Sequence, residues 1–559
     1  MKYPQILFIF SSGIIISCMN KPAPVVFEMP EGSWQSALVQ VNNFGKLTYN
    51  PCPDGFVIPD FSYAGYKNGE PIPNYRPPAS RIETVTPLPN ANSCNAAHIQ
   101  QAIDKIAALQ PDAAGFRGVV QLGPGRYNVD ATINLNASGI VLRGAGRGPD
   151  KAAVDLTETD LQNMTMIYRR GTGEGLATHV VIMGAASAGG ITWAGNTDVE
   201  DSKVNISTQK VMPGDMTFEV ESAAAYSAGD AICIRYPNTN ELLEALWYGG
   251  NSNWVIHGRE DQRWRMQDVN IAYHRYITKI EGNKITIDAP VFYVLDRQYS
   301  IAYMYKITTG TIYHNIGIED LRISMDRTPS SLRGSPDQNC IKMNALENSW
   351  AKGLHLSDYI HAGIKTEATT RITVEDCRSV DPSGSRGGGN HYSFENFHRS
   401  QLILFKNCFS REGRHGWISN GTTTVNGIVL LNHTNVNNRA TAAAEGHRYL
   451  SQGILLDGWK DHSTEGINSI GFFLRDNMGT FHGWGGIFSV LWNCDIQNSA
   501  VLLDKVPTGQ NYSIGSIAET VSSFRSYEPY ITGYNEGHNT PGLYPKSLYE
   551  AQLFARKNR

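Results

Sequence analysis

A short phrase recurs along the chain and restricts what it can fold into. It consists of an apolar residue, any residue, an Asp or Asn, and then a small or medium-sized residue. The Asp or Asn lies at positions 320, 348, 376, 407, 432, 461 and 493, with successive intervals of 28, 28, 31, 25, 29 and 32 residues. A loose repeat of about 28 residues is typical of a solenoid, in which each repeat forms one coil and packs on its neighbours. A β-sandwich with coincidental spacing is the alternative.

The residues between these positions predict strands. Apolar side chains alternate with polar ones only over short, strand-length runs, as in 371–374 and 401–404. Asn or Asp at a turn can hydrogen-bond neighbouring backbone, which explains a polar ladder at one position of each coil. We therefore predict an all-β fold: a single-stranded right-handed parallel β-helix with short capping helices at both ends.

The two ends of such a rod need covers, because they expose unpaired strands. A helical stripe from Ala96 to Leu109 predicts one cover, and the capping box Ser547–Glu550 predicts a helix for the other end. The β-helix is expected to span 91–535, followed by the C-terminal capping helix in 536–559. Residues 18–90 are expected to form a tether and an irregular arm. Residues 238–272, with three Trp and three Arg, are expected to form a long loop over one face.

The start of the chain has the features of an export signal. Residues 1–17 contain one Lys, an apolar stretch and a small residue directly before Cys18. This arrangement resembles a bacterial lipobox and predicts a signal peptide, with Cys18 acylated at the mature N-terminus. Ordinary signal cleavage nearby is the alternative. Acyl chains on Cys18 would anchor an exported protein to a bacterial membrane without a spanning helix.

Composition excludes several classes of protein. The chain of 559 residues has a net charge of −4 and a pI of about 6.4, which argues against a nucleic-acid-binding protein. A mean hydropathy of −0.30 excludes a protein with many membrane spans. Apart from Cys18 there are seven cysteines and no CxxC, so neither a disulfide framework nor a structural zinc site is expected. A Cys52–Cys94 bridge is left open, and the protein is expected to be a monomer.

Several longer phrases together resemble a known family. They resemble phrases of secreted bacterial β-helix proteins of the pectate-lyase superfamily, and they cover nearly the whole mature chain. The phrases are 60–66, 123–127, 139–146, 228–235, 386–388, 392–394, 413–415, 447–453 and 545–553. The resemblance implies an enzyme acting on polysaccharides, commonly a lyase of uronic-acid polymers. It implies no particular catalytic residues, because members of the superfamily differ in chemistry.

Polar residues of an unusual kind gather on three consecutive predicted coils. Tyr392 and His415 are 23 residues apart and His415 and His447 are 32 apart, which is near one coil each. Equivalent positions of successive coils form a row on one face of a solenoid, so these groups are expected to converge. The full set is Arg386, His391 and Tyr392 on one coil, Arg414 and His415 on the next, and His447, Arg448 and Tyr449 on the third.

These residue types fit β-elimination of a uronic-acid polysaccharide or oligosaccharide. Arg suits the carboxylate of the uronate, because its guanidinium binds two oxygens at once. We assign Arg414 and Arg448 to this role, His415 to the base and Tyr392 to the acid, with His447 as the reserve for either. Arg414 is expected to lower the pKa of His415 and keep it neutral. Arg386, His391, Tyr449, Trp417, Trp459 and Trp484 are predicted to bind the anionic substrate, the Trp side chains by stacking on sugars.

The alternatives concern metals and the reaction type. No cofactor or metal is expected, because the carboxylates near this face (Glu412, Glu445, Asp457) are scattered. Zn²⁺ bound by His415 and His447 is the alternative. A polygalacturonase-like hydrolase using Asp457 and Asp461 is a second class of function, whereas 196–198 matches a hydrolase motif only by chance. A dehydratase acting on a terminal sugar and a non-catalytic glycan-binding rod are also left open.

Overall fold

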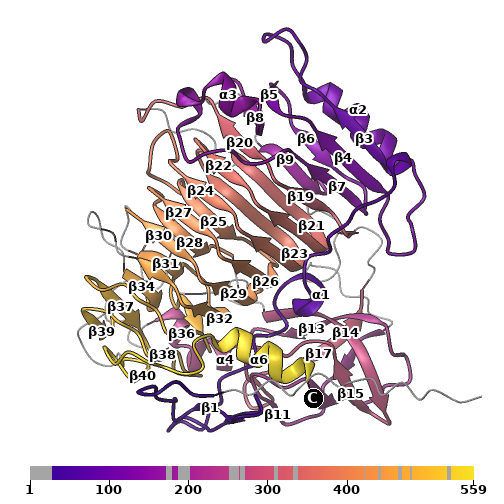
Figure 1. Ribbon diagram of the computed structural model, residues 1–559. Helices are drawn as coiled ribbons and strands as arrows, with labels where there is room; N and C mark the ends of the chain where they lie inside the picture. The colour runs from indigo at the N-terminus through magenta and orange to yellow at the C-terminus, as the bar shows by residue number, and fades with distance from the viewer. Residues whose placement is uncertain are drawn as a thin grey trace, which may run out of the picture.

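The protein is described by a computed structural model that covers residues 28–171, 179–186, 202–250, 264, 271–307, 312–331, 338–421, 423–437, 442–461, 463, 469–476, 478, 481–524 and 531–558. Its main body is a rod of parallel strands in which each coil lies against the next (Figure 1). Across 312–522 the strand pairings within this rod are all parallel. The prediction of a parallel β-helix is confirmed.

Each coil contributes strands to three faces. The first face carries β6 (Ile133–Leu135), β9 (His179–Gly184), β21 (Asn339–Lys352), β23 (Ala362–Glu375), β25 (Tyr392–Asn396), β28 (His415–Ser419), β31 (Ala442–Gly446), β34 (Ser469–Phe472), β37 (Ala500–Leu503) and β39 (Thr520–Ser522). The long strands β21 and β23 bend and continue into the second face.

The second face carries β3 (Ile82–Val85), β4 (Gly118–Leu122), β7 (Ile140–Arg143), β18 (Tyr313–His314), β19 (Gly317–Glu319), β26 (Gln401–Lys406), β29 (Asn426–Leu431), β32 (Ser451–Asp457), β35 (Gly486–Ile487), β36 (Val490–Trp492), β38 (Tyr512–Ile514) and β40 (Tyr534–Glu536). The third carries β5 (Gly125–Val129), β8 (Thr165–Arg169), β20 (Arg322–Met325), β22 (His355–Ser357), β24 (Arg378–Val380), β27 (Phe409–Arg411), β30 (Thr434–Val436) and β33 (Lys460–Asp461). Apolar side chains from all three faces fill the interior.

The polar ladder of the sequence marks the turn between the second and third faces. Asp320, Asp376, Asn407, Asn432 and Asn493 all have φ between 52° and 55°, a left-handed backbone that Asn and Asp tolerate best after glycine. At two coils the sequence pattern selects the wrong residue. Gly353 and Gly458 occupy the turn there, whereas Asn348 lies inside β21 and Asp461 inside β33. Glycine adopts the same backbone, so it breaks the sequence pattern without breaking the coil.

The N-terminal end of the rod is covered as predicted. Helix α2 (Ala96–Ala107) packs its apolar side, with Ile99, Ile103 and Ile106, on the first coils (Figure 1). The rod itself begins earlier than expected, because β3 pairs in parallel with β4. Short helical turns nearby are α1 (Tyr66–Gly69), η1 (Ala79–Arg81), η2 (Ala153–Asp155) and α3 (Glu158–Leu161).

At the other end the N-terminal arm contributes to the cover. Its hairpin of β1 (Val39–Val41) and β2 (Leu47–Tyr49) belongs to a core that includes residues of the last coils. Trp34 N donates to the carbonyl of Gly542 at 3.0 Å, and Ser36 Oγ donates to Glu536 at 2.6 Å. The C-terminal helix α6 (Leu548–Lys557) forms behind its N-cap Ser547 as predicted, but it does not cover the end of the rod. It lies along the side of the rod, between β32 and the arm (Figure 1).

Residues 204–306 form a unit that the sequence analysis missed. Six strands pair antiparallel in the order β10 (Val204–Asn205), β17 (Tyr303–Lys306), β13 (Ala231–Tyr236), β14 (Ile271–Glu281), β15 (Lys284–Ile287), β12 (Thr217–Glu219). A separate pair joins β11 (Lys210–Val211) to β16 (Leu295–Asp296). The unit contacts the second face through Arg275, which donates to Gln401 at 3.0 Å. These residues are therefore not coils of the β-helix.

The predicted loop 238–272 is partly described. It includes α4 (Asn240–Ala245), η4 (Trp247–Gly249) and the start of β14, and Trp264 lies 6.0 Å from Tyr449 between ring centres. Residues 251–263 and 265–270, like Cys18 and 196–198, lie outside the described residues. Cys52 and Cys94 are both free, so the bridge left open by the sequence is absent. Among the described helices, none is long and apolar enough to cross a membrane.

Candidate functional site

The predicted polar residues meet on the first face, where β25, β28 and β31 lie side by side. Strand register places Tyr392 directly beside His415, and their ring centres are 5.4 Å apart. The ring of His447 follows at 5.3 Å from that of His415 and 6.3 Å from that of Tyr392. The structure thus brings together the three side chains that the sequence assigns to proton transfer.

His415 presents one ring nitrogen with a lone pair. Its Nδ1 lies 2.7 Å from the carbonyl oxygen of Ala442, which can only accept, so Nδ1 carries the proton. Nε2 is buried and has no hydrogen-bond partner among the described residues. The pKa of His415 is lowered to about 3, mainly by burial; Glu445 opposes this shift, and His447, Arg414 and Arg475 contribute to it. The ring is therefore neutral at pH 7, for a reason that is mainly burial and only secondarily Arg414.

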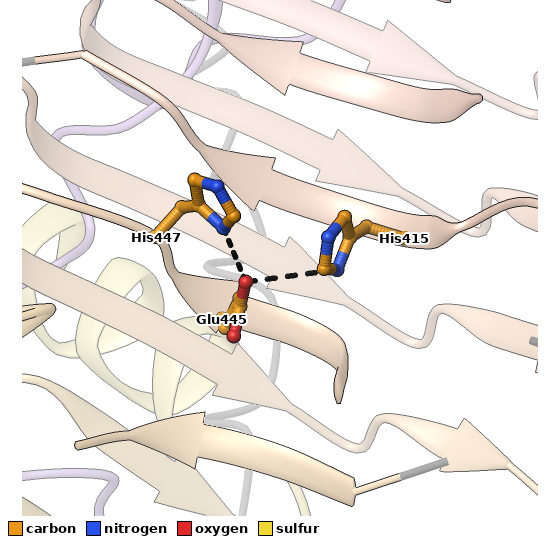
Figure 2. Close-up of side chains that lie close together, drawn as sticks. All are labelled: His415, Glu445 and His447. Carbon is orange, nitrogen blue, oxygen red and sulfur yellow. Dashed lines mark hydrogen bonds and ion pairs between the residues drawn. The ribbon is translucent and has the colours of Figure 1, made fainter. Parts of the chain in front are cut away.

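Glu445 holds the neighbouring imidazole. Figure 2 shows its carboxylate between the rings of His447 and His415. His447 Nδ1 and Arg475 Nη1 both donate to Oε1, and His415 Nδ1 lies 3.7 Å from the same oxygen. Arg475 Nε also donates to Nδ1 of His482 at 3.2 Å. Glu445 therefore fixes which nitrogen of His447 carries the proton and leaves Nε2 as the acceptor.

A second carboxylate lies on the other side of Tyr392. Glu395 accepts from Nε2 of His361 at 2.7 Å and from the Asn420 amide at 2.7 Å, and Lys365 Nζ is 4.0 Å away. Burial raises the pKa of Glu395, but these cationic and hydrogen-bonding partners outweigh it and hold the pKa well below its usual range. Glu395 is therefore ionised and cannot donate a proton.

Tyr392 is a protonated hydroxyl beside these groups. Its side chain is 2% exposed, and within the part of the chain that the structure describes the hydroxyl has no hydrogen-bond partner. Burial raises the pKa of Tyr392 to about 12, with Arg414 opposing this. A phenol that is protonated at pH 7 and has no protein partner can donate to a ligand.

The predicted arginines differ in their surroundings. Arg414 is half-buried and, among the described residues, its guanidinium has no carboxylate partner, although its charge lowers the pKa of Tyr392, His415 and His447. Arg448 is also half-buried, and its Nε donates to the carbonyl of Asn420 at 3.2 Å. Arg386 is exposed on the turn before β25. A half-buried guanidinium without a carboxylate partner among the described residues is available to bind an anionic ligand.

The prediction that three tryptophans stack on sugars is wrong. Trp417, Trp459 and Trp484 are each at most 1% exposed. Trp417 donates to the Asn396 amide oxygen inside the rod, Trp459 stacks on His433 at 4.1 Å, and Trp484 donates to the Leu246 carbonyl. Their indoles point into the interior or under the 204–306 unit, so no sugar reaches them.

Other predicted residues have structural partners. The Nε2 of His391 donates to the Ser383 carbonyl at 2.9 Å, so this group is already paired within the protein and does not support the predicted role in substrate binding. Asp457 and Asp461 are fully buried and do not form an accessible acid pair. Asp457 accepts from Ser547 Oγ and Tyr549 N at the start of α6, whereas Asp461 accepts from Asn435 and Ser463. Tyr449 is half-buried beside Trp264.

The cluster has the geometry of a small metal site but the protonation of an acid–base site. Ligand atoms of His415, Glu445 and His447 lie within 4.8 Å of one another. However, the nitrogens that face Glu445 carry protons, and Arg475 occupies the same carboxylate oxygen. A cation there would also meet the positive charge of Arg414. These hydrogen bonds favour proton transfer over metal binding.

Sequence reasoning missed the groups that hold the site together. These are His361, Lys365, Glu395, Glu445, Arg475 and His482, of which only Glu445 was noted, as a scattered carboxylate. The sequence holds a signal for two of them, Glu445 and Arg475. Glu445 is two residues from His447 at the end of one strand, and Arg475 follows one coil later. The others come from different coils and carry no local pattern.

Comparisons with known proteins show similarity in fold. No protein-family model matches the sequence, and no curated protein matches it either. Solved structures do match: a tailspike protein of Pseudomonas phage LKA1 is 14% identical, with 79% of this chain and 74% of that chain covered, at a TM-score of 0.33. The surface adhesin PfbA of Streptococcus pneumoniae is 9% identical, with 80% of each chain covered, at 0.41. An alginate lyase of a Paenibacillus strain is 9% identical, with 82% and 98% covered, at 0.33.

At these identities and TM-scores the matches assign no function to this chain. The resemblance to the pectate-lyase superfamily therefore stays a prediction. What the protein does has to be argued from the cluster on the first face.

Proposed function

We propose that the protein is a carbon–oxygen lyase that cleaves a uronic-acid-containing polysaccharide or oligosaccharide by β-elimination. One observation carries the proposal: three neighbouring polar groups are left unpaired among the described residues. The Arg414 guanidinium has no carboxylate partner, and His415 Nε2 and the Tyr392 hydroxyl have no hydrogen-bond partner. They are a cation, a base and an acid, which are the groups that such an elimination requires.

The proton and electron movements follow from these positions. Arg414 binds the uronate carboxylate and stabilises the negative charge that develops at C5. His415 Nε2 takes the C5 proton, and the electron pair of the C5–H bond forms the C4–C5 double bond. The C4–O bond breaks, and the leaving oxygen takes the proton of Tyr392. Solvent then removes the proton from His415 and returns one to Tyr392.

Glu445 supports the step by electrostatics. When His415 accepts a proton its ring becomes positive, and the carboxylate 3.7 Å from Nδ1 stabilises that charge. His447, held by Glu445, is the adjacent acceptor that serves either role if the sugar binds in the opposite sense.

Hydrolysis is less well supported. A glycosidase of the two-carboxylate type needs a carboxylic acid whose pKa is raised. Glu395 has a lowered pKa, and Asp457, whose pKa burial raises to about 7, lies beneath α6 with its side chain fully buried. Among the described residues, neither of these carboxyl groups meets the requirement.

The test is to incubate the protein with a panel of uronic-acid polysaccharides and to record ultraviolet absorbance. Elimination creates a double bond conjugated with the carboxylate and raises the absorbance, whereas hydrolysis releases reducing ends without it. Reducing ends without absorbance would replace the lyase by a hydrolase. Absence of both on every substrate that the protein binds would favour a non-catalytic glycan-binding rod.

We also propose that the protein is exported and anchored through Cys18. The support is the sequence of residues 1–18 alone. Cys18→Ser should move the protein from the membrane fraction to the soluble fraction, and unchanged membrane association would contradict lipidation.

A further inference from the structure

A second group of cationic side chains lies at the far end of the same strands. Arg448 follows His447 after β31, Arg399 lies two coils earlier after β25, and Lys365 lies three coils earlier on β23. We call Arg448, Arg399 and Lys365 the basic patch. Tyr392 opens β25 and Lys365 pairs with Glu395 near its other end, so about 10 Å of strand, three residues at about 3.3 Å each, separates Lys365 from the Tyr392 end of the site.

The carboxylates near the patch do not neutralise it. Glu367 is shared by Lys342 Nζ at 3.2 Å and Arg399 Nη2 at 3.9 Å. Glu395 is shared by His361 and Lys365. Four cationic side chains, Arg448, Arg399, Lys365 and Lys342, therefore face two carboxylates, an excess of two positive charges.

Arg448 is the member of the patch that lacks a counter-ion. Its Nε donates to the Asn420 carbonyl, and its guanidinium lies 5.4 Å from the centre of the Tyr449 ring. Among the described residues no carboxylate pairs with it. The hydrogen bond and the ring hold the side chain in place, so its two Nη groups form a fixed fork rather than a mobile surface charge.

An aromatic surface lies beside the cations. Phe397 is half-buried, with Lys365 Nζ 4.3 Å from its ring centre and the His398 ring 3.9 Å away. Burial, followed by Arg448, lowers the pKa of His398 to about 4, so this imidazole adds no charge at pH 7. A flat apolar ring next to a fixed cation is suited to an acidic sugar, which has an apolar face and a charged substituent.

We propose that the basic patch binds a second oxyanion of the same glycan, a carboxylate or sulfate on a sugar other than the one that is cleaved. The inference rests on the proposed function and deepens it. Arg414 binds the carboxylate at the reacting sugar, and Arg448 selects a chain whose neighbouring sugars are also acidic. The preferred substrate is thus a contiguous polyanion rather than a glycan with isolated uronates.

The experiment compares Arg448→Gln with wild type on three polymers: a homopolymer of uronic acid, a polymer in which uronates alternate with neutral sugars, and an alternating polymer whose second sugar is sulfated. Arg411→Gln is the matched control, because Arg411 is an arginine of β27, on the third face, paired with Asp381 and Asp150. Circular dichroism confirms that both variants are folded.

For Arg448→Gln we expect KM on the homopolymer to rise about tenfold, equivalent to about 1.4 kcal/mol, with kcat nearly unchanged. KM on the neutral alternating polymer should not change, and Arg411→Gln should change neither. A rise also on the sulfated polymer extends the site to sulfate, whereas no rise there restricts it to carboxylate. An equal loss on all three polymers, a loss in kcat alone, or no loss at all would overturn the proposal.

Binding measurements separate this proposal from the proposed function. Calorimetry measures the affinity of wild type and of Arg448→Gln for a uronic-acid trisaccharide and for the single uronate. If wild type binds the trisaccharide more tightly and Arg448→Gln removes that advantage, the subsite stands even when no elimination occurs. If both proteins bind the two ligands equally, the subsite fails even when elimination occurs.

Discussion

Two histidines on the same coil, one inside the rod and one on its first face, have similar pKa values but different surroundings. His433 lies inside the rod, where it stacks on Trp459 at 4.1 Å and hydrogen-bonds Ser410 through Nε2 at 2.8 Å. His415 lies on the outside of the first face beside Glu445. Each has a pKa of about 3 and is neutral at pH 7. Burial alone lowers the pKa of His433, whereas charged groups also act on that of His415.

A lowered pKa therefore does not by itself mark a functional histidine. The inner site consists of His433, the Trp459 ring and the Ser410 hydroxyl. These groups hold a neutral imidazole but offer no group that can act on a ligand. The outer site adds an unpaired cation and an unpartnered phenol, which can act on a ligand. Four predictions test this contrast, in order of decreasing effect.

Acid should lower the unfolding free energy of the protein through the histidines of both sites. The unfolded chain binds protons on His355, His415, His433 and His482 below the ordinary pKa of 6.5, but the folded chain does so only near 3, because burial lowers each pKa. The unfolded state thus binds more protons between pH 6.5 and 3, and the stabilising effect of these groups is lost as pH falls through that range.

Denaturant unfolding at pH 7 and pH 4.5 measures this loss, which should be on the order of 10 kcal/mol for the four imidazoles together, since each is displaced over about two pH units at about 1.4 kcal/mol per unit. Asp457 acts in the opposite direction: burial raises its pKa to about 7, so its stabilising contribution is present below pH 3.8 and lost as pH rises through 7. Equal stability at the two pH values would contradict the burial of the histidines.

Trp459→Ala should affect the inner site only. It removes the indole that stacks on His433 and leaves a cavity, at a cost of about 3–5 kcal/mol of unfolding free energy. Turnover per folded molecule and KM should not change, because Trp459 does not reach the outer face. A raised KM at normal stability would restore Trp459 to the substrate site.

His415→Ala and Tyr392→Phe should affect the outer site only. Each removes a proton carrier, and turnover should fall about 10²-fold or more, with the rod still folded. The matched control is His314→Ala, which removes an exposed imidazole on β18. Near-normal turnover in both folded variants would place the active face elsewhere.

Arg414→Lys should produce a smaller effect. Lys keeps the charge but loses the two-point geometry on a carboxylate, so kcat/KM should fall about tenfold. Arg411→Lys, on the third face, is the control and should not lower kcat/KM. If Arg414→Lys retains full activity, Arg414 does not bind the carboxylate.

The fold was largely predictable, but one unit was not. Residues such as Asn407 and Asn432 recur because each coil needs a left-handed turn, and a recurring turn is a local property that the sequence displays. The antiparallel strands of 204–306 have the same short, alternating pattern as the coils. Whether a strand pairs in parallel or antiparallel depends on its partner, so β13 and β14 could not be distinguished from coil strands.

For the candidate site, the sequence predicted which residues of successive coils lie side by side. Coil-length spacing correctly brought Tyr392, His415 and His447 together. It could not tell the outside of the rod from the inside, since a shift of one residue reverses the two faces of a strand. The three tryptophans were therefore assigned to sugars, although Trp417 and Trp459 pack in the interior and Trp484 packs under the 204–306 unit.

Local patterns in the sequence specify the repeat, the turns at five Asp and Asn positions, and the coil on which each polar residue lies. The tertiary structure alone decided which side chains face outward, that Arg475 and Glu445 meet across 30 residues, and that Arg414 and Arg448 have no counter-ion among the described residues. The physical reason is that burial and charge at a point depend on every group around it. In a solenoid most of those groups come from other coils, and no local pattern records them.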